Sequence, residues 1–394
     1  MMTDFQRGVL DLLRVCMNGG QVVLPPDFDW DMACRLGKAH QILPMLYYGA
    51  MQSEAKMPEE IRNSLESVTF RSIYVDRNQL YALDELNRRF EENGIDYLPL
   101  KGSTLKYFYP KTEMRSMGDA DVLIRTEQYE QIKPLLANLG YDEILESDHE
   151  LVWDKKGVLH LELHKRLIPS YNKDYYAYFG DGWKLAHRES GYRYKMMAED
   201  EFIYLFTHYA KHYRDAGIGI RHLMDLYVFL KSHTELDCVY IEKELDCLQL
   251  LHFYRNSKET AAVWFDGAAD TEISDFMTDR IFKSGSYGTR ENQSLSEGLK
   301  QSKEISAEKV QKNKLRQLIF PSAKMLSKKY SCLQKAPWLL PFVWIYRWTV
   351  AILFKRKNIK RQRENVSIMS AENITAYQRE LNFVGLDFNF EEQK

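Results

Sequence analysis

The sequence predicts an α+β protein that is mostly helical, in which a small mixed β-sheet core is flanked by N- and C-terminal helical regions. Three observations support this fold class. Apolar residues recur at three- and four-residue spacing before residue 94, as amphipathic helices require. Strand-like and helix-like segments then alternate between residues 95 and 164, which is typical of a compact α/β unit. Helical spacing returns from residue 195 onward.

Four regions follow from these changes in pattern. The chain has 394 residues, more than one ordinary domain of roughly 100–200 residues holds. We expect an N-terminal helical region over 1–93, an α/β core over 94–192, a helical domain over 193–300 that completes a cleft, and a basic amphipathic region over 301–394. With 45% hydrophobic and 28% charged residues, the composition excludes a disordered chain, a collagen-like fibre and a polytopic membrane protein.

The individual elements can be placed in order. The N-terminal region has helical spacing over 28–51 and 63–93, closed by Gly94 as a helix stop. The core is predicted to hold strands at 95–100, 119–124 and 158–164 and helices at 104–109 and 126–139, with a loop before the last strand.

The later part of the chain is predicted to be largely helical. Residues 195–264 have helical spacing, interrupted by a turn at Gly217-Ile218-Gly219. The segment 266–301 is rich in Gly, Ser and Thr, a composition that favours a long loop. A basic helical stretch follows it.

The cysteines and the N-terminal residues indicate the cellular compartment of the protein. The five cysteines are widely spaced and include no CxxC pair, which argues against a zinc ribbon or a disulfide framework. The first residues include acidic side chains and lack a long apolar run, so they do not resemble a signal peptide. We therefore expect a cytoplasmic protein.

Three carboxylates form the main candidate site. Asp119 and Asp121 stand two residues apart at the head of a predicted strand, so their side chains leave the same face. Glu162 occupies the middle of another predicted strand, with Leu161 and Leu163 on the opposite face. If the two strands are neighbours, Glu162 completes a three-carboxylate cluster. Such clusters bind Mg²⁺, or Mn²⁺, and suit nucleotidyl transfer with two metals.

A small-residue turn lies upstream of these carboxylates. Lys101-Gly102-Ser103 connects a predicted strand to a helix, and backbone N–H groups at a helix start bind phosphate. Gly102 permits close approach of a ligand, Ser103 can donate a hydroxyl and Lys101 can neutralise a phosphate. The turn lacks the GxxxxGK spacing of a Walker A loop.

Together these segments resemble a known family. Leu100-Lys-Gly-Ser-Thr-Leu105, Arg115-Ser-Met-Gly-Asp-Ala-Asp-Val-Leu-Ile124 and Leu161-Glu-Leu-His164 are similar to bacterial nucleotidyltransferases of the polymerase-β-like superfamily, and more closely to the group described only as uncharacterised nucleotidyltransferases. The turn and the first carboxylate pair are farther apart here than is usual in the superfamily, and the third acid is Glu162 where Asp is commoner.

The resemblance implies an activity and a set of ligands. It implies a metal-dependent enzyme that transfers a nucleoside monophosphate from an NTP such as ATP to an acceptor, with release of pyrophosphate. The acceptor is left open: a small molecule, a glycan or a protein, with nucleic acid less favoured. A catalytically inactive nucleotide-binding protein, or a membrane-associated adaptor that keeps the fold, is the alternative. A toxin-type enzyme would differ only in its acceptor.

Other residues have two interpretations each. Arg115 can hold a triphosphate oxygen through a bidentate pair or form a structural ion pair. Arg221 and Asp225 stand four apart on a predicted helix and form either a plain salt bridge or, as the resemblance implies, a nucleotide or acceptor contact. His160 and His164 share the face of Glu162 and are either neighbours of the metals or core histidines.

Two further histidines have metal-compatible spacing. His208 and His212 stand four apart on a predicted helix, but no HExxH motif and no third ligand accompany them. We therefore do not expect a zinc site there.

The C-terminal region is strongly basic. Sixteen Lys and Arg and two acidic residues lie between residues 303 and 363, a net charge of +14 (16 − 2). The apolar, Trp-rich segment 337–354 within it is interrupted by Pro341 and Arg347 and is marginal for spanning a bilayer. Over 337–363 the pattern suits an interfacial helix on an anionic membrane, at its inner face. The alternative is a helix docked on the protein.

Overall fold

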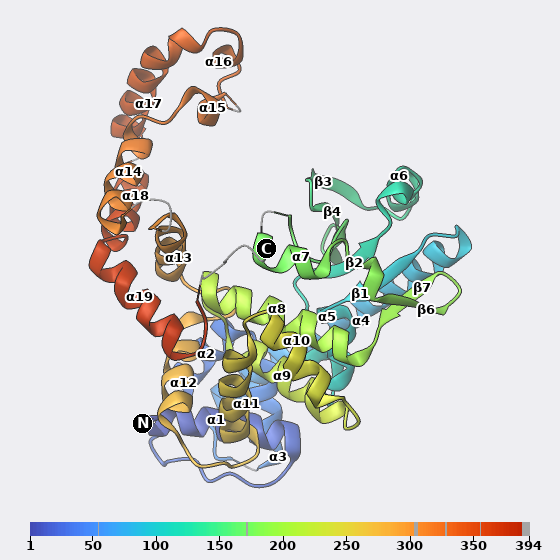
Figure 1. Ribbon diagram of the computed structural model, residues 1–394. Coiled ribbons are helices and arrows are strands. Elements are labelled where there is room, and N and C mark those ends of the chain that lie inside the picture. Colours follow the sequence, from blue (N-terminus) through green and yellow to red (C-terminus); the bar gives the residue numbers. More distant parts are fainter. Residues whose placement is uncertain (54, 171, 303–305, 328, 355, 388–394) are drawn as a thin grey trace. The chain divides into compact units, whose positions relative to one another are not determined.

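The protein is described by a computed structural model, shown in Figure 1. The described residues are 1–53, 55–170, 172–302, 306–327, 329–354 and 356–387. They divide into two compact units. The larger holds 1–211 and 218–286, and the smaller holds 212–217 and 287–387. The mostly helical α+β fold class is confirmed.

The N-terminal region is helical, as expected. It consists of α1 (Asp4–Asn18), α2 (Trp30–His40), α3 (Leu43–Gln52) and α4 (Glu59–Glu92). The side chain of Thr3 accepts a hydrogen bond from the Gln6 amide in a capping box that begins α1. The long helix α4 is followed by Gly94, whose φ of 69° is a left-handed conformation that glycine adopts without strain.

A single mixed sheet of seven strands forms the core of the larger unit. The order of the strands across it is β3-β4-β5-β2-β1-β7-β6. The strands are β1 (Tyr97–Leu100), β2 (Ala120–Ile124), β3 (Asp142–Glu146), β4 (Glu150–Lys155), β5 (Leu159–His164), β6 (Ala186–Ser190) and β7 (Arg193–Met196). Strand β2 is central, runs antiparallel to β1 and parallel to β5, and is buried along its whole length.

Alternation along β2 and β5 gives the sheet one apolar and one polar face. Ala120, Val122 and Ile124 share a buried cluster with the three leucines of β5, with Leu86 and Phe90 of α4, and with Ile132 of α6 (Tyr129–Asn138). Helices α4 and α6 therefore cover this face. Because side chains alternate along a strand, Asp121 and Glu162 leave the opposite face.

The strands missing from the sequence prediction lie at the margins of the sheet. Residues 142–155 were expected to be a loop but form β3 and β4. Every residue of β3 is exposed, so the strand has no apolar alternation to reveal it. The same reason applies to β6, most of which is also exposed.

The helices after the sheet largely follow expectation, with one correction. They are α8 (Ala198–Asp215), α9 (Ile220–Ser232), α10 (Cys238–Cys247) and α11 (Leu251–Phe265), whereas α7 (Lys173–Phe179) lies between β5 and β6. The expectation of a long loop over 266–301 is wrong, because α12 (Glu272–Ser284) and α13 (Arg290–Ser302) lie there. Thr271 caps α12, so part of the Ser and Thr content marks a helix start rather than a loop.

The smaller unit contains α13 and the basic C-terminal helices. These are α14 (Ala307–Ile319), α15 (Ala323–Leu326), α16 (Cys332–Lys335), α17 (Leu340–Phe354), α18 (Arg356–Ile368) and α19 (Ala371–Phe383). Helix α13 packs against α14, α18 and α19. A side chain at Gly298 of α13 would meet Ile374 of α19 at 2.9 Å, so the two helices approach closely there.

Candidate active site

The two predicted carboxylate strands are neighbours in the sheet. Strand β2 pairs in parallel with β5, and Asp121 stands directly beside Glu162 in their register. Asp121 is 4% exposed, whereas Glu162 is partly exposed. Residues 121 and 162 therefore present two carboxylates side by side on the polar face of the sheet.

Lys101 connects the small-residue turn to these carboxylates. Its Nζ lies 2.7 Å from Asp121 Oδ1, and both side chains are largely buried. Lys101 has a φ of 49°, which is uncommon for a residue with a side chain and is found mostly at turns and functional sites. The turn after β1 thus holds an ammonium group against the central carboxylate.

His164, two residues beyond Glu162 on β5, completes the cluster. Its Nε2 lies 2.7 Å from Asp121 Oδ1 and 3.7 Å from Glu162 Oε2. A carboxylate only accepts hydrogen bonds, so Nε2 carries the proton that it donates to Asp121. The interpretation of His164 as a neighbour of the carboxylates fits this geometry, with His164 orienting Asp121.

The two carboxylates have opposite electrostatic surroundings. Burial opposes ionisation of Asp121, but the Lys101 ammonium and the hydrogen bond from His164 outweigh it and hold the pKa of Asp121 well below its usual range. Burial, reinforced by the charges of Asp121 and Asp119, raises the pKa of Glu162 to about 7. The cluster therefore holds one firmly ionised carboxylate beside one that resists ionisation.

Asp119 lies at the edge of the cluster. It precedes β2 and is exposed, whereas Asp121 is buried within the strand. Its charge still acts on Glu162 and Lys101, which places it near both. Asp121 and Glu162 thus form an inner pair with the exposed Asp119 nearby, and among the described residues no group of three potential metal ligands includes Asp119.

The cluster suits a divalent cation. Ligand atoms of Asp121, Glu162 and His164 all lie within 4.8 Å of one another, and carboxylate oxygens are preferred ligands of Mg²⁺. Burial first, and then the charges of Asp121 and Asp119, raise the pKa of Glu162, so the protein alone does not compensate a second ionised carboxylate there. A cation bound by Asp119, Asp121 and Glu162 would remove that repulsion, with Lys101 leaving Asp121 for another anion.

Glu162 gives a pH dependence that can be measured without knowing the substrate. Its pKa is about 7 in the folded protein against an ordinary 4.5, so between these pH values the folded state binds more protons than the unfolded state. Stability in EDTA should therefore fall as the pH rises from about 4.5 to about 7. The measurement is denaturant unfolding of the wild type and of Glu162→Gln across this window.

The Glu162→Gln protein should lack this contribution, and added Mg²⁺ should flatten the wild-type curve by favouring the ionised carboxylate. Identical pH profiles of the two proteins in EDTA would contradict the assignment of a raised pKa to Glu162.

Arg115 forms a buried ion pair behind the turn. Its Nε donates to Asp225 Oδ1 at 2.8 Å, and its Nη1 donates to the Ser116 carbonyl oxygen at 2.7 Å. Tyr109 also donates to Asp225 Oδ1, at 2.8 Å. The guanidinium borders Gly102, where an added Cβ would lie 3.5 Å from Nη1. This geometry favours the interpretation of Arg115 as a structural ion pair that supports the turn.

Replacing Arg115 by Lys tests that interpretation. Lysine keeps the charge but cannot reproduce the two directed bonds to Asp225 and Ser116, so the free energy of unfolding should fall by about 1 kcal/mol. Affinity for NTP should stay within about threefold of the wild type. Urea unfolding and nucleotide titration measure the two quantities. An unchanged stability with a loss of NTP affinity above tenfold would instead assign Arg115 to the triphosphate.

Arg221 lies on α9, one turn before Asp225, and makes separate contacts. Its Nη1 donates to Gln41 Oε1 at 2.5 Å and to the Ser116 carbonyl oxygen at 2.9 Å. Asp225 accepts hydrogen bonds from Arg115 and Tyr109. These contacts join α9 to the segment that precedes Asp119, so Arg221 and Asp225 support the loop before β2.

Gly102 and Ser103 begin the short helix α5 (Gly102–Leu105). Both are buried, and the Ser103 hydroxyl donates to the Leu100 carbonyl oxygen at 2.7 Å. Thr104, one residue on, donates to Glu201 of α8 at 3.0 Å. The turn is therefore held between the end of β1 and α8.

Several neighbours of the cluster escaped sequence analysis. The ring of His149 lies 5.1 Å from that of His164, and Glu150 stands opposite His164 across the strands β4 and β5. Burial raises the pKa of Tyr204, on α8, to about 12, and the nearby Lys101 ammonium opposes that rise. The apolar run Leu151–Trp153 was the one signal that could have indicated β4.

The remaining predicted histidines are not part of the carboxylate cluster. His160 Nδ1 lies 3.5 Å from Asp154 Oδ1. The ring of His208 lies 6.5 Å from that of Tyr204 on the same helix. Within the described ranges, no group of three potential metal ligands contains His208 or His212.

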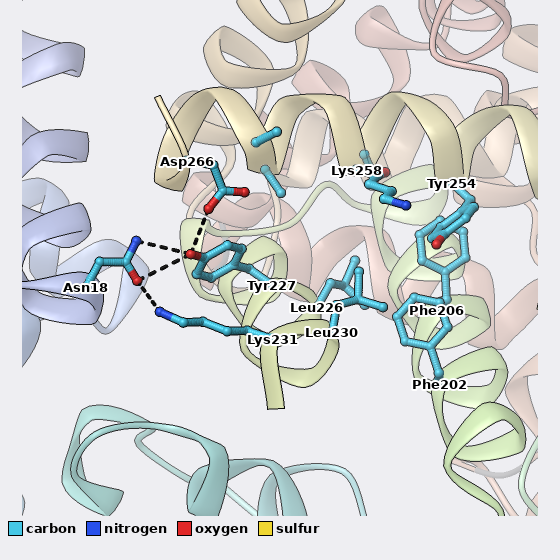
Figure 2. Close-up of a pocket in the computed structure, with 13 residues that line it drawn as sticks. Asn18, Phe202, Phe206, Leu226, Tyr227, Leu230, Lys231, Tyr254, Lys258 and Asp266 are labelled. Atoms are coloured by element: carbon cyan, nitrogen blue, oxygen red, sulfur yellow. Dashed lines mark hydrogen bonds between the residues drawn. The ribbon is translucent and has the colours of Figure 1, made fainter. Parts of the chain in front are cut away.

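A separate pocket is lined by residues of α1, α8, α9 and α11 (Figure 2). Its volume is about 460 Å³, and α8 contributes Phe202 and Phe206 to its apolar wall. Tyr204 is two residues from each, roughly 200° around the helix, and faces Lys101 instead. At the polar end, the Tyr227 hydroxyl donates to Asp266 at 2.9 Å. Because α8 separates it from Lys101, this pocket is distinct from the carboxylate cluster.

Comparison with known proteins identifies one family. A family model described as an uncharacterised nucleotidyltransferase matches residues 26–266. The match covers more than half of the chain and includes the turn, the three carboxylates and the Arg115–Asp225 pair. It ends before the smaller unit resumes at residue 287. No curated protein and no solved structure matches the chain.

Proposed function

Because this chain belongs to the family of uncharacterised nucleotidyltransferases, we propose that it transfers a nucleoside monophosphate from an NTP to an acceptor and releases pyrophosphate. Family membership assigns nucleotidyl transfer in general. We further propose that the reaction depends on a divalent metal, that the residues named below carry it out, and that the acceptor reacts through a hydroxyl group.

One observation carries the proposal. Asp121 and Glu162 stand side by side on adjacent parallel strands, and Lys101 from the small-residue turn contacts Asp121 at 2.7 Å. The turn that would hold the triphosphate is thereby joined to the carboxylates that would hold the metal. Two carboxylates held side by side repel each other, and this repulsion adds to burial in raising the pKa of Glu162. A catalytically inactive protein would have no reason to keep this unfavourable pair.

Asp119, Asp121 and Glu162 would bind Mg²⁺, and the same oxygen ligands would accept Mn²⁺. When bound, the metal would supply charge neutralisation for the triphosphate and for the pyrophosphate that leaves.

The protein's own residues would have distinct tasks. Lys101 would move from Asp121 to a phosphate oxygen of the NTP. Gly102, which has no side chain, and the small Ser103 would let the backbone approach the triphosphate. The acceptor hydroxyl oxygen would bond to the α-phosphorus while the bond between that phosphorus and the oxygen bridging to the β-phosphate breaks. Glu162 would take the hydroxyl proton.

Two labels of the same NTP test this reaction. With purified protein and Mg²⁺, label in the α-phosphate should move to an acceptor in pools of small molecules, glycans or proteins. Label in the γ-phosphate should appear only in pyrophosphate. Transfer of the γ-label would mean phosphoryl rather than nucleotidyl transfer. Binding of NTP without pyrophosphate release across all pools would favour the inactive nucleotide-binding alternative.

A further inference from the structure

Helix α17 in the smaller unit is apolar on most of its circumference, with Arg347 and Thr349 as exceptions, yet it is largely uncovered. The stretch Pro337–Phe354 is long and apolar enough to cross a membrane by length and composition, but only 6% of it is buried within the described structure. A helix that is apolar on all sides is normally buried in a protein or in lipid. Among the described residues of the smaller unit, only one side of α17 is covered, so we look for a partner for its other side.

The covered side of α17 is held by two tryptophans. The indole of Trp344 donates to the Pro321 carbonyl oxygen at 2.9 Å, and that of Trp348 donates to the Ile319 carbonyl oxygen at 2.9 Å. Both rings pack edge-on against Phe320. This side therefore docks on the segment that follows α14.

The opposite side is a mostly apolar stripe, interrupted by the exposed Thr349. Phe342, Ile345, Tyr346, Ile352 and Leu353 are spaced at three, one, six and one residues, which places them on one face of a helix. All five side chains are more than half exposed. We call these five residues the α17 stripe. Large aromatic side chains also lie exposed at its two ends, Trp338 and Phe354.

Charge identifies what covers the stripe. The segment 303–363 carries sixteen basic and two acidic residues, and Lys324, Lys329 and Lys335, just before α17, are exposed. A second copy of this chain would bring the same positive charge against itself, whereas anionic lipid would attract it. Tyr and Trp at the margins of an apolar surface favour the headgroup region of a bilayer.

The helix is better suited to lie in the interface than to cross it. The eighteen residues Pro337–Phe354 extend about 27 Å, which is only marginal for a ~30 Å hydrocarbon core, and Arg347 interrupts the apolar segment. The backbone contacts of Trp344 and Trp348 also keep one side of α17 on protein. We infer that the α17 stripe inserts into the headgroup region of an anionic membrane and that the surrounding lysines bind the lipid phosphates.

Vesicle binding of the full chain tests this inference. The probes are vesicles of phosphatidylcholine alone and of phosphatidylcholine mixed with phosphatidylglycerol. The wild type should co-sediment with the mixed vesicles, at least tenfold less with the neutral ones, and progressively less as salt is added. The triple variant Phe342→Ser/Ile345→Ser/Leu353→Ser should bind the mixed vesicles at least tenfold more weakly.

A matched control is available on α4. Phe70, Tyr74 and Tyr81 are 64%, 70% and 73% exposed but lie outside the basic region, so Phe70→Ser/Tyr74→Ser/Tyr81→Ser should bind like the wild type. The inference is overturned if the wild type binds neither vesicle, or if the α4 variant loses as much binding as the α17 variant. It is also overturned if the wild type self-associates through the stripe without binding lipid, or if carbonate extraction shows a spanning helix.

Discussion

Replacing Asp121 by Asn is expected to reduce the free energy of unfolding by about 3 kcal/mol, the lower end of the range for removing one partner of a buried ion pair. The substitution leaves the Lys101 ammonium, 16% exposed, without a negative partner at 2.7 Å. It also replaces the carboxylate that accepts the hydrogen bond from His164. Urea unfolding at neutral pH measures this loss.

A second substitution separates the charge effect from packing. Lys101→Met removes the unpaired ammonium, so the double variant Lys101→Met/Asp121→Asn should recover a large part of the lost stability. A double variant as unstable as the sum of the two single variants would show that Lys101 and Asp121 do not interact energetically. All three variants should lose nucleotidyl transfer, because each removes a proposed ligand or phosphate contact.

Replacing Asp119 by Asn is expected to abolish activity without affecting the fold. Asp119 is exposed, and substitutions at such positions usually change stability by less than about 0.5 kcal/mol. Removing a residue that only hydrogen-bonds to a metal ligand already reduces metal affinity or enzyme activity by about 10- to 100-fold. Removal of a direct ligand should therefore reduce transfer by at least about 100-fold.

Initial rates of pyrophosphate release and the unfolding curve of the same preparation measure the two effects. Asp142→Asn is the matched control, because Asp142 is an exposed aspartate on β3 away from the cluster, and it should retain wild-type rates. Full turnover by the Asp119→Asn protein would remove Asp119 from the metal site.

The paired carboxylate strands were predictable from the sequence alone. Leu159–Leu163 alternates between apolar and polar residues with period two, and the three residues after Asp121 form a short apolar run. We expected a carboxylate cluster only on the condition that the two strands are neighbours, because the periodicity of each strand does not show which strands pair. The structure supplies it through the parallel register of Asp121 with Glu162.

The division of roles within the cluster was not predictable. Sequence spacing treats Asp119 and Asp121 alike, yet one precedes the strand and is exposed while the other is buried and bound to Lys101. That difference depends on where β2 begins, and strand ends are the least certain part of a sequence prediction. His149 and Tyr204 come close to the cluster because β4 and α8 pack beside it. Local sequence patterns do not show this tertiary packing.

Metal-dependent nucleotide binding is tested most directly by calorimetric titration of the purified protein with each NTP, with and without Mg²⁺, in the wild type and in the Asp119→Asn variant. We expect binding that requires Mg²⁺, that prefers one or a few bases and that disappears in the variant while the unfolding curve is unchanged. Binding that is indifferent to Mg²⁺ and to the substitution, or no binding of any NTP by the folded wild type, would contradict the proposed metal site.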